Sequence, residues 1–300
     1  MKRNMFLDLS EYIPEFQFTD WEKLTPVVME AGRYQEGQYI LPMSYTTPIT
    51  LFRKSEAPHT HSEDMTWDDM LAGGPALQAA AVMDSSIYQG CVFQPFTDLE
   101  RDELAFSEEE LLNFVKRKLQ VYHELSEDVP DFFTRRLEVG FDVDLDPEKF
   151  DSDESFSMIP IYSLQGGYGA MVVSFAAVNA NTTQPEAAVF LTDYLLSEAC
   201  QSSCLYAYAT SSLAVPTMEG LMQEGKSGVS FEEGSWSMSQ ENYETFASLR
   251  EHIAWAEFCT PLGVELQQLF GDAQDSSQAK TLEELVHGAY MRMQMMVAES

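Results

Sequence analysis

The stretch that decides the fold is Gln165-Gly166-Gly167-Tyr168-Gly169, which leads into Met171-Val172-Val173-Ser174-Phe175-Ala176-Ala177-Val178. A near-continuous apolar run of this length, opened by glycines, is typical of a strand. Residues 185–195 follow with a proline in the first turn and apolar residues at helical spacing, which predicts a helix. A strand followed by a helix favours an α/β fold.

The same alternation continues on both sides of this stretch. Residues 39–42 and 49–52 read as strands. Thr66 is placed to cap a helix that starts at Trp67, and Ser107-Glu108-Glu109-Glu110 is a capping-box start for a long helix. In that helix we expect Leu111, Leu112, Val115, Leu119 and Tyr122, at helical spacing, to form the buried stripe. A further helix is predicted from Thr19-Asp20 to Ala31-Gly32, with Pro26 bending or delaying it.

The composition limits the class of partner. The chain has 300 residues, 45% of them hydrophobic, and its 49 acidic and 17 basic residues give a net charge of -32. Such a charge repels phosphate backbones and anionic lipids, so we expect no nucleic-acid or membrane-surface partner. The acidic residues are interleaved with apolar ones, which favours a folded protein with an acidic surface over a disordered acidic chain.

The sequence gives no sign of a membrane-spanning or export segment, or of a disulfide framework. No stretch approaches the roughly 20 apolar residues that cross a bilayer, and Met1-Lys2-Arg3-Asn4 is followed by no apolar region, so we expect no export signal in this chain. The few cysteines are too sparse for a disulfide framework, and we expect buried small side chains rather than metal or redox chemistry. They are Cys91, Cys200, Cys204 and Cys259.

Several short motifs, taken in order, resemble the sugar-binding family of extracellular solute-binding proteins of ABC importers. Each motif is weak alone, but together they span the chain from about residue 6 to its end. The motifs are Glu36-Gly37-Gln38-Tyr39-Ile40-Leu41-Pro42, Thr50-Leu51-Phe52-Arg53-Lys54, Met65-Thr66-Trp67-Asp68-Asp69-Met70, Gly166-Gly167 with its apolar strand, Glu186-Ala187-Ala188-Val189-Phe190-Leu191, Leu195-Leu196-Ser197-Glu198-Ala199-Cys200-Gln201, Val215-Pro216, and Thr281-Leu282-Glu283-Glu284-Leu285 through Met291-Arg292-Met293.

The resemblance implies a two-lobed, periplasmic-binding-protein-like α/β fold with a hinge between the lobes. The N-terminal lobe would take residues 1–46 and 172–218, and the C-terminal lobe residues 47–171 and 219–300. Family members open with a signal peptide and the first strands of the first lobe, whereas this chain starts near Phe6-Leu7-Asp8. We therefore expect an incomplete N-terminal lobe, from either a fragment or a misassigned start.

The resemblance also implies a function. The parent protein would be a monomeric, extracellular lipoprotein anchored to the cell surface. It would capture a sugar or oligosaccharide between its lobes, deliver the sugar to the membrane permease of an ABC transporter, need no cofactor and catalyse no reaction. Ligand-induced closure of the lobes would be the signal that the permease recognises.

Sugar sites combine flat aromatic rings with a few hydrogen-bonding groups in a pre-formed cleft. The expected ligand contacts lie where the chain would cross the hinge a first time, at Tyr45 to Thr47, and a second time, beside Gly166-Gly167, and also before the C-terminal helices. For each of them simple core packing is an alternative. They are Tyr45, Thr46, Thr47, Gln165, Gly166, Gly167, Tyr168 and Trp255. Trp255 is placed where the family often supplies a stacking aromatic.

An acidic segment has part of the spacing of a calcium loop. Asp142, Asp144, Asp146 and Asp153 supply carboxylates, but Pro147 stands where the turn of such a loop needs glycine. We expect a solvated acidic loop and no metal site.

Two other functions remain as alternatives. His59-Thr60-His61 is a metal-like or acid-base cluster, which would suit a carbohydrate-active or metal-dependent hydrolase. An exposed, proline-containing loop is the simpler interpretation of these residues. The remaining alternative is a truncated fragment without function.

Overall fold

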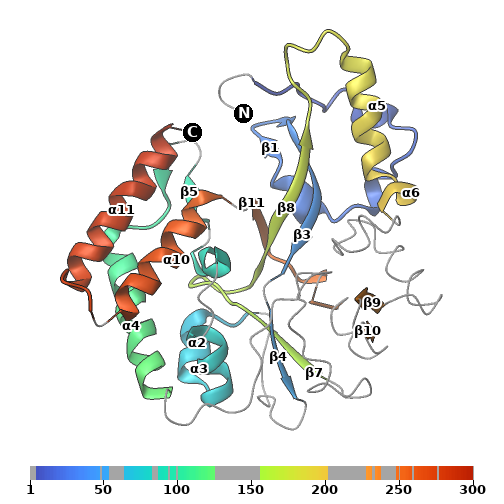
Figure 1. Ribbon diagram of the computed structural model, residues 1–300. Helices are drawn as coiled ribbons and strands as arrows, with labels where there is room; N and C mark the ends of the chain where they lie inside the picture. The colour runs from blue at the N-terminus through green and yellow to red at the C-terminus, as the bar shows by residue number, and fades with distance from the viewer. Residues whose placement is uncertain are drawn as a thin grey trace. The chain divides into compact units, whose positions relative to one another are not determined.

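The computed structural model describes most of the chain, which folds into two compact units (Figure 1). The described residues are 5–47, 49–53, 64–82, 87–93, 95–98, 101–125, 156–201, 228–231, 234–237, 248–249, 251–258, 260–275 and 277–299. Unit 1 holds the described residues of Met1–Pro48 and Ala170–Phe258. Unit 2 holds those of Ile49–Arg135, Phe156–Gly169 and Cys259–Ser300.

A three-stranded sheet organises unit 1, in the order β11-β8-β3. The central strand is β8 (Gly169–Ala177), the apolar run that the sequence predicts, and β3 (Ile40–Thr46) and β11 (Trp255–Phe258) flank it (Figure 1). The strands β3 and β8 run antiparallel, with Ile40 opposite Ala177 and Thr46 opposite Met171. Bulges interrupt this register around Ser44, where the strand bends.

The remaining elements of unit 1 are short, apart from one helix. Its helices are η1 (Ile13–Glu15), η2 (Trp21–Lys23), α1 (Pro26–Glu30), α5 (Pro185–Leu196) and α6 (Glu198–Gln201). Its other strands are the antiparallel pairs β1 (Arg33–Tyr34) with β2 (Gly37–Gln38) and β9 (Gly228–Phe231) with β10 (Gly234–Ser237). As predicted, Pro185 opens α5, where its missing N–H costs no hydrogen bond.

A buried carboxylate ties the N-terminal segment of unit 1 to α5. Asp193 is 3% exposed, and its side chain accepts hydrogen bonds from the backbone N–H groups of Gln17 at 2.7 Å, Phe18 at 3.2 Å and Thr19 at 2.9 Å. The hydroxyl of Thr19 returns a hydrogen bond of 2.6 Å to the backbone carbonyl of Asp193. The acid therefore satisfies three consecutive donors that no regular element pairs.

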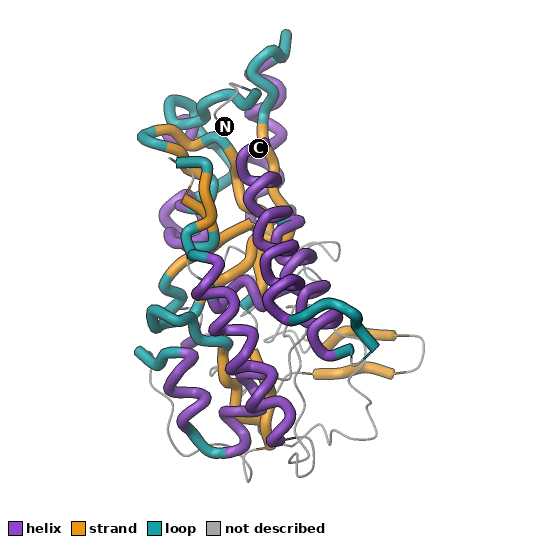
Figure 2. The backbone as a smooth tube through the Cα atoms, turned by 90° about the vertical axis from the view of Figure 1, so that its left-hand side faces the viewer, coloured by secondary structure: helices purple, strands orange, loops and turns teal. Residues whose placement is uncertain are grey.

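Unit 2 is mainly helical. Its helices are α2 (Trp67–Ala72), α3 (Pro75–Val82), η3 (Ile87–Val92), α4 (Glu108–Leu125), α10 (Pro261–Gln274) and α11 (Leu282–Glu299). Its strands form the antiparallel pairs β4 (Ile49–Arg53) with β7 (Phe156–Pro160) and β5 (Thr97–Asp98) with β6 (Glu103–Leu104). The helices α4 and α11 pack together, as do α10 and α11 (Figure 2).

The predicted helix caps of unit 2 are confirmed. The hydroxyl of Thr66 accepts from the N–H of Asp69, whose carboxylate accepts from the N–H of Thr66, and Ser107 and Glu110 form the same reciprocal pair. Hydrogen bonds from the hydroxyl and N–H of Thr66 lower the pKa of Asp69. Those from the N–H and hydroxyl of Ser107 lower the pKa of Glu110.

The buried face of α4 differs from the predicted stripe. Leu111 and Val115 are buried as expected, whereas Leu112, Leu119 and Tyr122 are only half-buried. Phe114 and Lys118 lie on the buried face in their place. Lys118 is 1% exposed, and its ammonium lies 4.3 Å from the centroid of the Phe270 ring. Attraction between the cation and the ring is one interaction that stabilises a charged residue at a core position that periodicity assigns to apolar side chains.

Two further predictions need correction. The helix expected over residues 19–32 is divided into η2 and α1. Pro26, where a bend or delay was expected, supplies no N–H to an earlier turn and starts α1. The sequence placed residues 219–300 in the second lobe, but β11 belongs to unit 1 because it pairs with β8. Among the described helices, none is long and apolar enough to span a membrane.

We expect Asp193→Asn to destabilise the protein by about 2–3 kcal/mol, since the amide cannot accept from all three N–H groups and turns its own NH₂ toward them. Asp68→Asn is the control, because Asp68 is 54% exposed in its ion pair with Arg117. The Asp68→Asn variant should lower the free energy of unfolding by less than about 1 kcal/mol. Urea unfolding measures both, and equal effects would contradict the role of Asp193.

We expect the two capping carboxylates to make stability fall in acid. Their pKa values in the folded protein lie below the ordinary 3.8 for Asp69 and 4.5 for Glu110, so their contribution is complete above those values and is lost as the pH falls through the lower, folded ones. The double variant Asp69→Asn, Glu110→Gln should lose less stability than the wild type between neutral pH and about pH 3 in urea titrations. Glu109→Gln, which removes neither bond, should keep the wild-type dependence.

Candidate ligand site

The glycine pair of the second predicted crossing forms a tight turn in unit 2. Gly166 and Gly167 have φ values of 96° and 73°, a conformation that side chains with a Cβ rarely adopt. Ser163 closes the turn with two hydrogen bonds. Its hydroxyl donates to the carbonyl of Gly166 at 2.8 Å, and its backbone N–H donates to the carbonyl of Gly167 at 2.9 Å. The N–H of Gly167 also donates to the carbonyl of Met65, which fixes the turn to the segment before α2.

The side chains beside this turn lie in different surroundings. Gln165 is exposed, so it is free to reach a ligand. Tyr168 is 1% exposed, and its ring meets that of Tyr162 edge-on at 5.7 Å. This contact of Tyr168 is core packing, the alternative that the sequence left open.

The first predicted crossing lies at the end of β3, in unit 1. Tyr45 is 1% exposed, and its hydroxyl lies 3.5 Å from that of Thr25. Thr46 is the last residue of β3, opposite Met171, and its side chain is not among those that the structure describes. Thr47 follows the strand and is 1% exposed.

Two of the predicted contacts carry unpaired polar atoms. The Oγ1 of Thr47 and the indole Nε1 of Trp255 are buried and have no hydrogen-bond partner, and no other buried side-chain nitrogen or oxygen of the described residues shares that state. A buried polar group without a partner costs about 1–3 kcal/mol, so such groups are rare and ask for an explanation. Both belong to unit 1.

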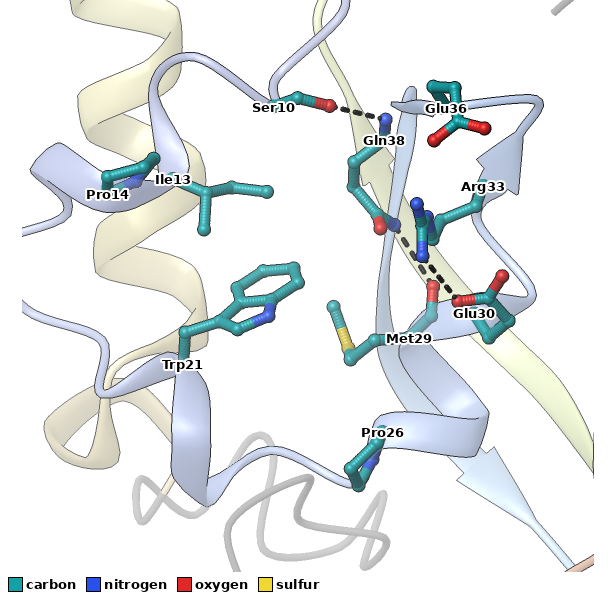
Figure 3. Close-up of a pocket in the computed structure, with 10 residues that line it drawn as sticks. All are labelled: Ser10, Ile13, Pro14, Trp21, Pro26, Met29, Glu30, Arg33, Glu36 and Gln38. Atoms are coloured by element: carbon teal, nitrogen blue, oxygen red, sulfur yellow. Dashed lines mark hydrogen bonds and ion pairs between the residues drawn. The ribbon is translucent and has the colours of Figure 1, made fainter.

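A pocket of about 400 Å³ opens elsewhere in unit 1, among residues that the sequence did not single out as a site (Figure 3). Its apolar wall comes from η1, η2 and α1, and its polar edge from the segment that leads into β3. The lining residues are Ser10, Ile13, Pro14, Trp21, Pro26, Met29, Glu30, Arg33, Glu36 and Gln38. The one sequence signal for this pocket is Trp21, a large aromatic residue within the polar segment Thr19-Asp20-Trp21-Glu22-Lys23.

Hydrogen bonds hold the polar edge of this pocket in place. The carboxylate of Asp8 and the hydroxyl of Ser10 both accept from the N–H of Gln38, at 3.2 and 2.9 Å. Partial burial raises the pKa of Asp8, but hydrogen bonds from Ser10 and Gln38 outweigh that effect and leave the pKa below its ordinary value.

Several predicted features lie outside the described residues. They include the acidic loop over residues 142–153, the pair His59 and His61, Cys204, and the turn at Val215-Pro216. In the part of the chain that the structure describes, no three His, Cys, Asp or Glu side chains gather as a metal would need.

Solved structures share this architecture. An extracellular solute-binding protein of family 1 from Alicyclobacillus acidocaldarius superposes with a TM-score of 0.60 at 11% identity, over 99% of this chain and 80% of its own. The chain has the fold of extracellular solute-binding proteins. An oligogalacturonide-binding protein from Yersinia enterocolitica reaches 0.59 at 15% identity, over 98% and 80% of the two chains. The sugar-binding protein MalE from Xanthomonas citri reaches 0.57 at 12%, over 99% and 80%.

The fold predicted from the ordered motifs is thus confirmed. No protein-family model and no curated sequence matches the chain. A designed esterase also superposes, with a TM-score of 0.57 at 14% identity over 98% of this chain and 80% of its own. Likeness at such identities concerns the fold and leaves activity to be argued from the residues.

We expect Gly166→Ala to lower the unfolding free energy by about 1–2 kcal/mol, because alanine is strained at this positive φ. The added Cβ would also lie 3.4 Å from the carbonyl oxygen of Asp64. Gly271→Ala is the matched control, since Gly271 lies within α10 with no atom near the added Cβ. There alanine should stabilise by about 0.5–1 kcal/mol, and thermal unfolding of the two variants should give shifts of opposite sign.

Proposed function

We propose that this chain is the substrate-binding component of an ABC importer, which captures a sugar or oligosaccharide and delivers it to a membrane permease. In this role the parent protein is a monomer outside the cell, anchored to the cell surface by a lipid, and it catalyses no reaction. The fold supports the proposal, since several neighbours with this architecture are described as oligogalacturonide- or sugar-binding proteins.

The observation that carries the proposal is the pair of unpaired polar atoms on Thr47 and Trp255. Both residues were predicted as ligand contacts from the sequence, and both present a buried hydrogen-bonding atom that no described protein group satisfies. A ligand hydroxyl accepts from an indole N–H and either accepts from or donates to a threonine hydroxyl, so a sugar supplies what both atoms lack.

The predicted contacts in unit 2 fit the same role. The positive φ values of Gly166 and Gly167 bring the backbone into a tight turn, and Gln165 beside them offers an exposed amide that both donates and accepts. With Tyr45 and Tyr168 packed in the core, the side chains of unit 1 that we propose to hydrogen-bond the ligand are Thr47 and Trp255.

We expect Thr47→Val and Trp255→Phe each to weaken sugar binding about tenfold, because each removes one hydrogen bond to the ligand. Neither should destabilise the free protein through hydrogen bonding, since the atom that it removes has no partner there. Calorimetric titration with glucose, maltotriose and digalacturonate measures affinity, and thermal unfolding without ligand measures stability.

Matched controls separate binding from folding. The hydroxyl of Thr192 donates to the carbonyl of Val189 at 2.7 Å. The indole N–H of Trp67 donates to the carbonyl of Ala81 at 3.2 Å. Thr192→Val and Trp67→Phe should therefore lower the melting temperature and leave the affinity unchanged. The proposal fails if no saccharide in the panel binds, or if Thr47 and Trp255 behave as their controls do.

A further inference from the structure

The pocket around Trp21 has a flat aromatic wall and an apolar floor. Trp21 and Ile13 lie on one side and Met29 and Gln38 on the other, with their side chains directed toward the space between them (Figure 3). Its volume of about 400 Å³ falls within the range of small-molecule sites, roughly 300–1,000 Å³. Apolar surface beside an indole face suits the C–H face of a ring.

Gln38 places a fixed acceptor at the polar edge of this pocket. Its side chain is held by two hydrogen bonds, in which Nε2 donates to the carbonyls of Met29 at 3.0 Å and Ile40 at 2.7 Å. Both partners are acceptors, so the orientation of the amide is determined and its Oε1 is the remaining acceptor. Gln38 is only 4% exposed, and no described group donates to that oxygen.

The charged residues at the rim complement this acceptor. Arg33 forms an ion pair of 3.0 Å with Glu30 through one nitrogen, which leaves further guanidinium N–H groups to donate. Glu36 is exposed and adds a carboxylate acceptor. Arg33 balances Glu30, and Glu36 leaves the rim with one net negative charge. The rim combines donors and acceptors within reach of one ligand.

We propose that this pocket binds one neutral, polyhydroxylated ring of hexose size, at a site distinct from Thr47 and Trp255. Hydroxyl groups both donate and accept, as Gln38, Glu36 and Arg33 require, and the ring's C–H face covers Trp21. An anion would meet the carboxylates of Glu30 and Glu36. A cation would meet the Arg33 guanidinium and leave its donors without acceptors.

The test uses the full chain with its tryptophan indoles labelled with ¹⁵N. Trp21→Phe identifies the Trp21 resonance among those of the 4 tryptophans. Titration with glucose, galactose and mannose should shift this resonance saturably, and Trp255→Phe should leave that shift intact. This independence separates the pocket from the proposed transport site, so either can fail alone.

Two variants test whether the pocket binds the monosaccharide. Trp21→Ala removes the stacking wall, and Glu36→Arg changes an exposed rim residue without touching the core, so it keeps the test valid if Trp21→Ala does not fold. Each variant should weaken the binding of the monosaccharide at least tenfold. For Trp21→Ala, which lacks the reporting resonance, affinity is measured by calorimetry in a protein that also carries Trp255→Phe. The proposal is overturned if the Trp21 resonance does not respond to about 50 mM monosaccharide, a concentration that detects even millimolar affinity. It is also overturned if choline shifts this resonance and sugars do not, or if Glu36→Arg binds as the wild type does.

Discussion

The carboxylate of Asp193 is the contact on which the N-terminal part of unit 1 depends. It gathers three successive backbone N–H groups, from Gln17 to Thr19, and so fixes to α5 a segment with no strand or helix of its own. The short helices η1 and η2 lie on either side of this segment and supply Ile13 and Trp21 to the pocket. A buried acid is costly unless it is fully hydrogen-bonded, and here that requirement positions a loop.

The requirement that buried polar groups be hydrogen-bonded also distinguishes structural side chains from candidate functional ones. Thr192 and Trp67 are buried with their polar atoms paired to backbone carbonyls, and we assign them to folding. Thr47 and Trp255 are comparable side chains whose polar atoms have no partner, and we assign them to a ligand. Residue type is alike in the two groups, so the distinction lies in the hydrogen bonds.

Local features were the part of the fold that could be predicted from sequence. The capping boxes at Thr66 and Ser107, the proline that opens α5 and the apolar strand β8 all depend on residues close together in the chain. The strand β11 and the buried Lys118 were missed. The first is a strand through its pairing with β8, and the second packs its ammonium against the ring of Phe270, so both involve residues distant in sequence.

By itself the sequence determined the alternation of strands and helices, the glycine turn and the types of side chain available to a ligand. Those properties follow from local propensity and from the chemistry of single residues. Only the tertiary structure decided that Tyr45 and Tyr168 pack in the core, that Thr47 and Trp255 keep unpaired atoms, and that Gln38 faces a pocket with Trp21. Burial and hydrogen bonding arise when distant segments meet, and no local pattern encodes where they do.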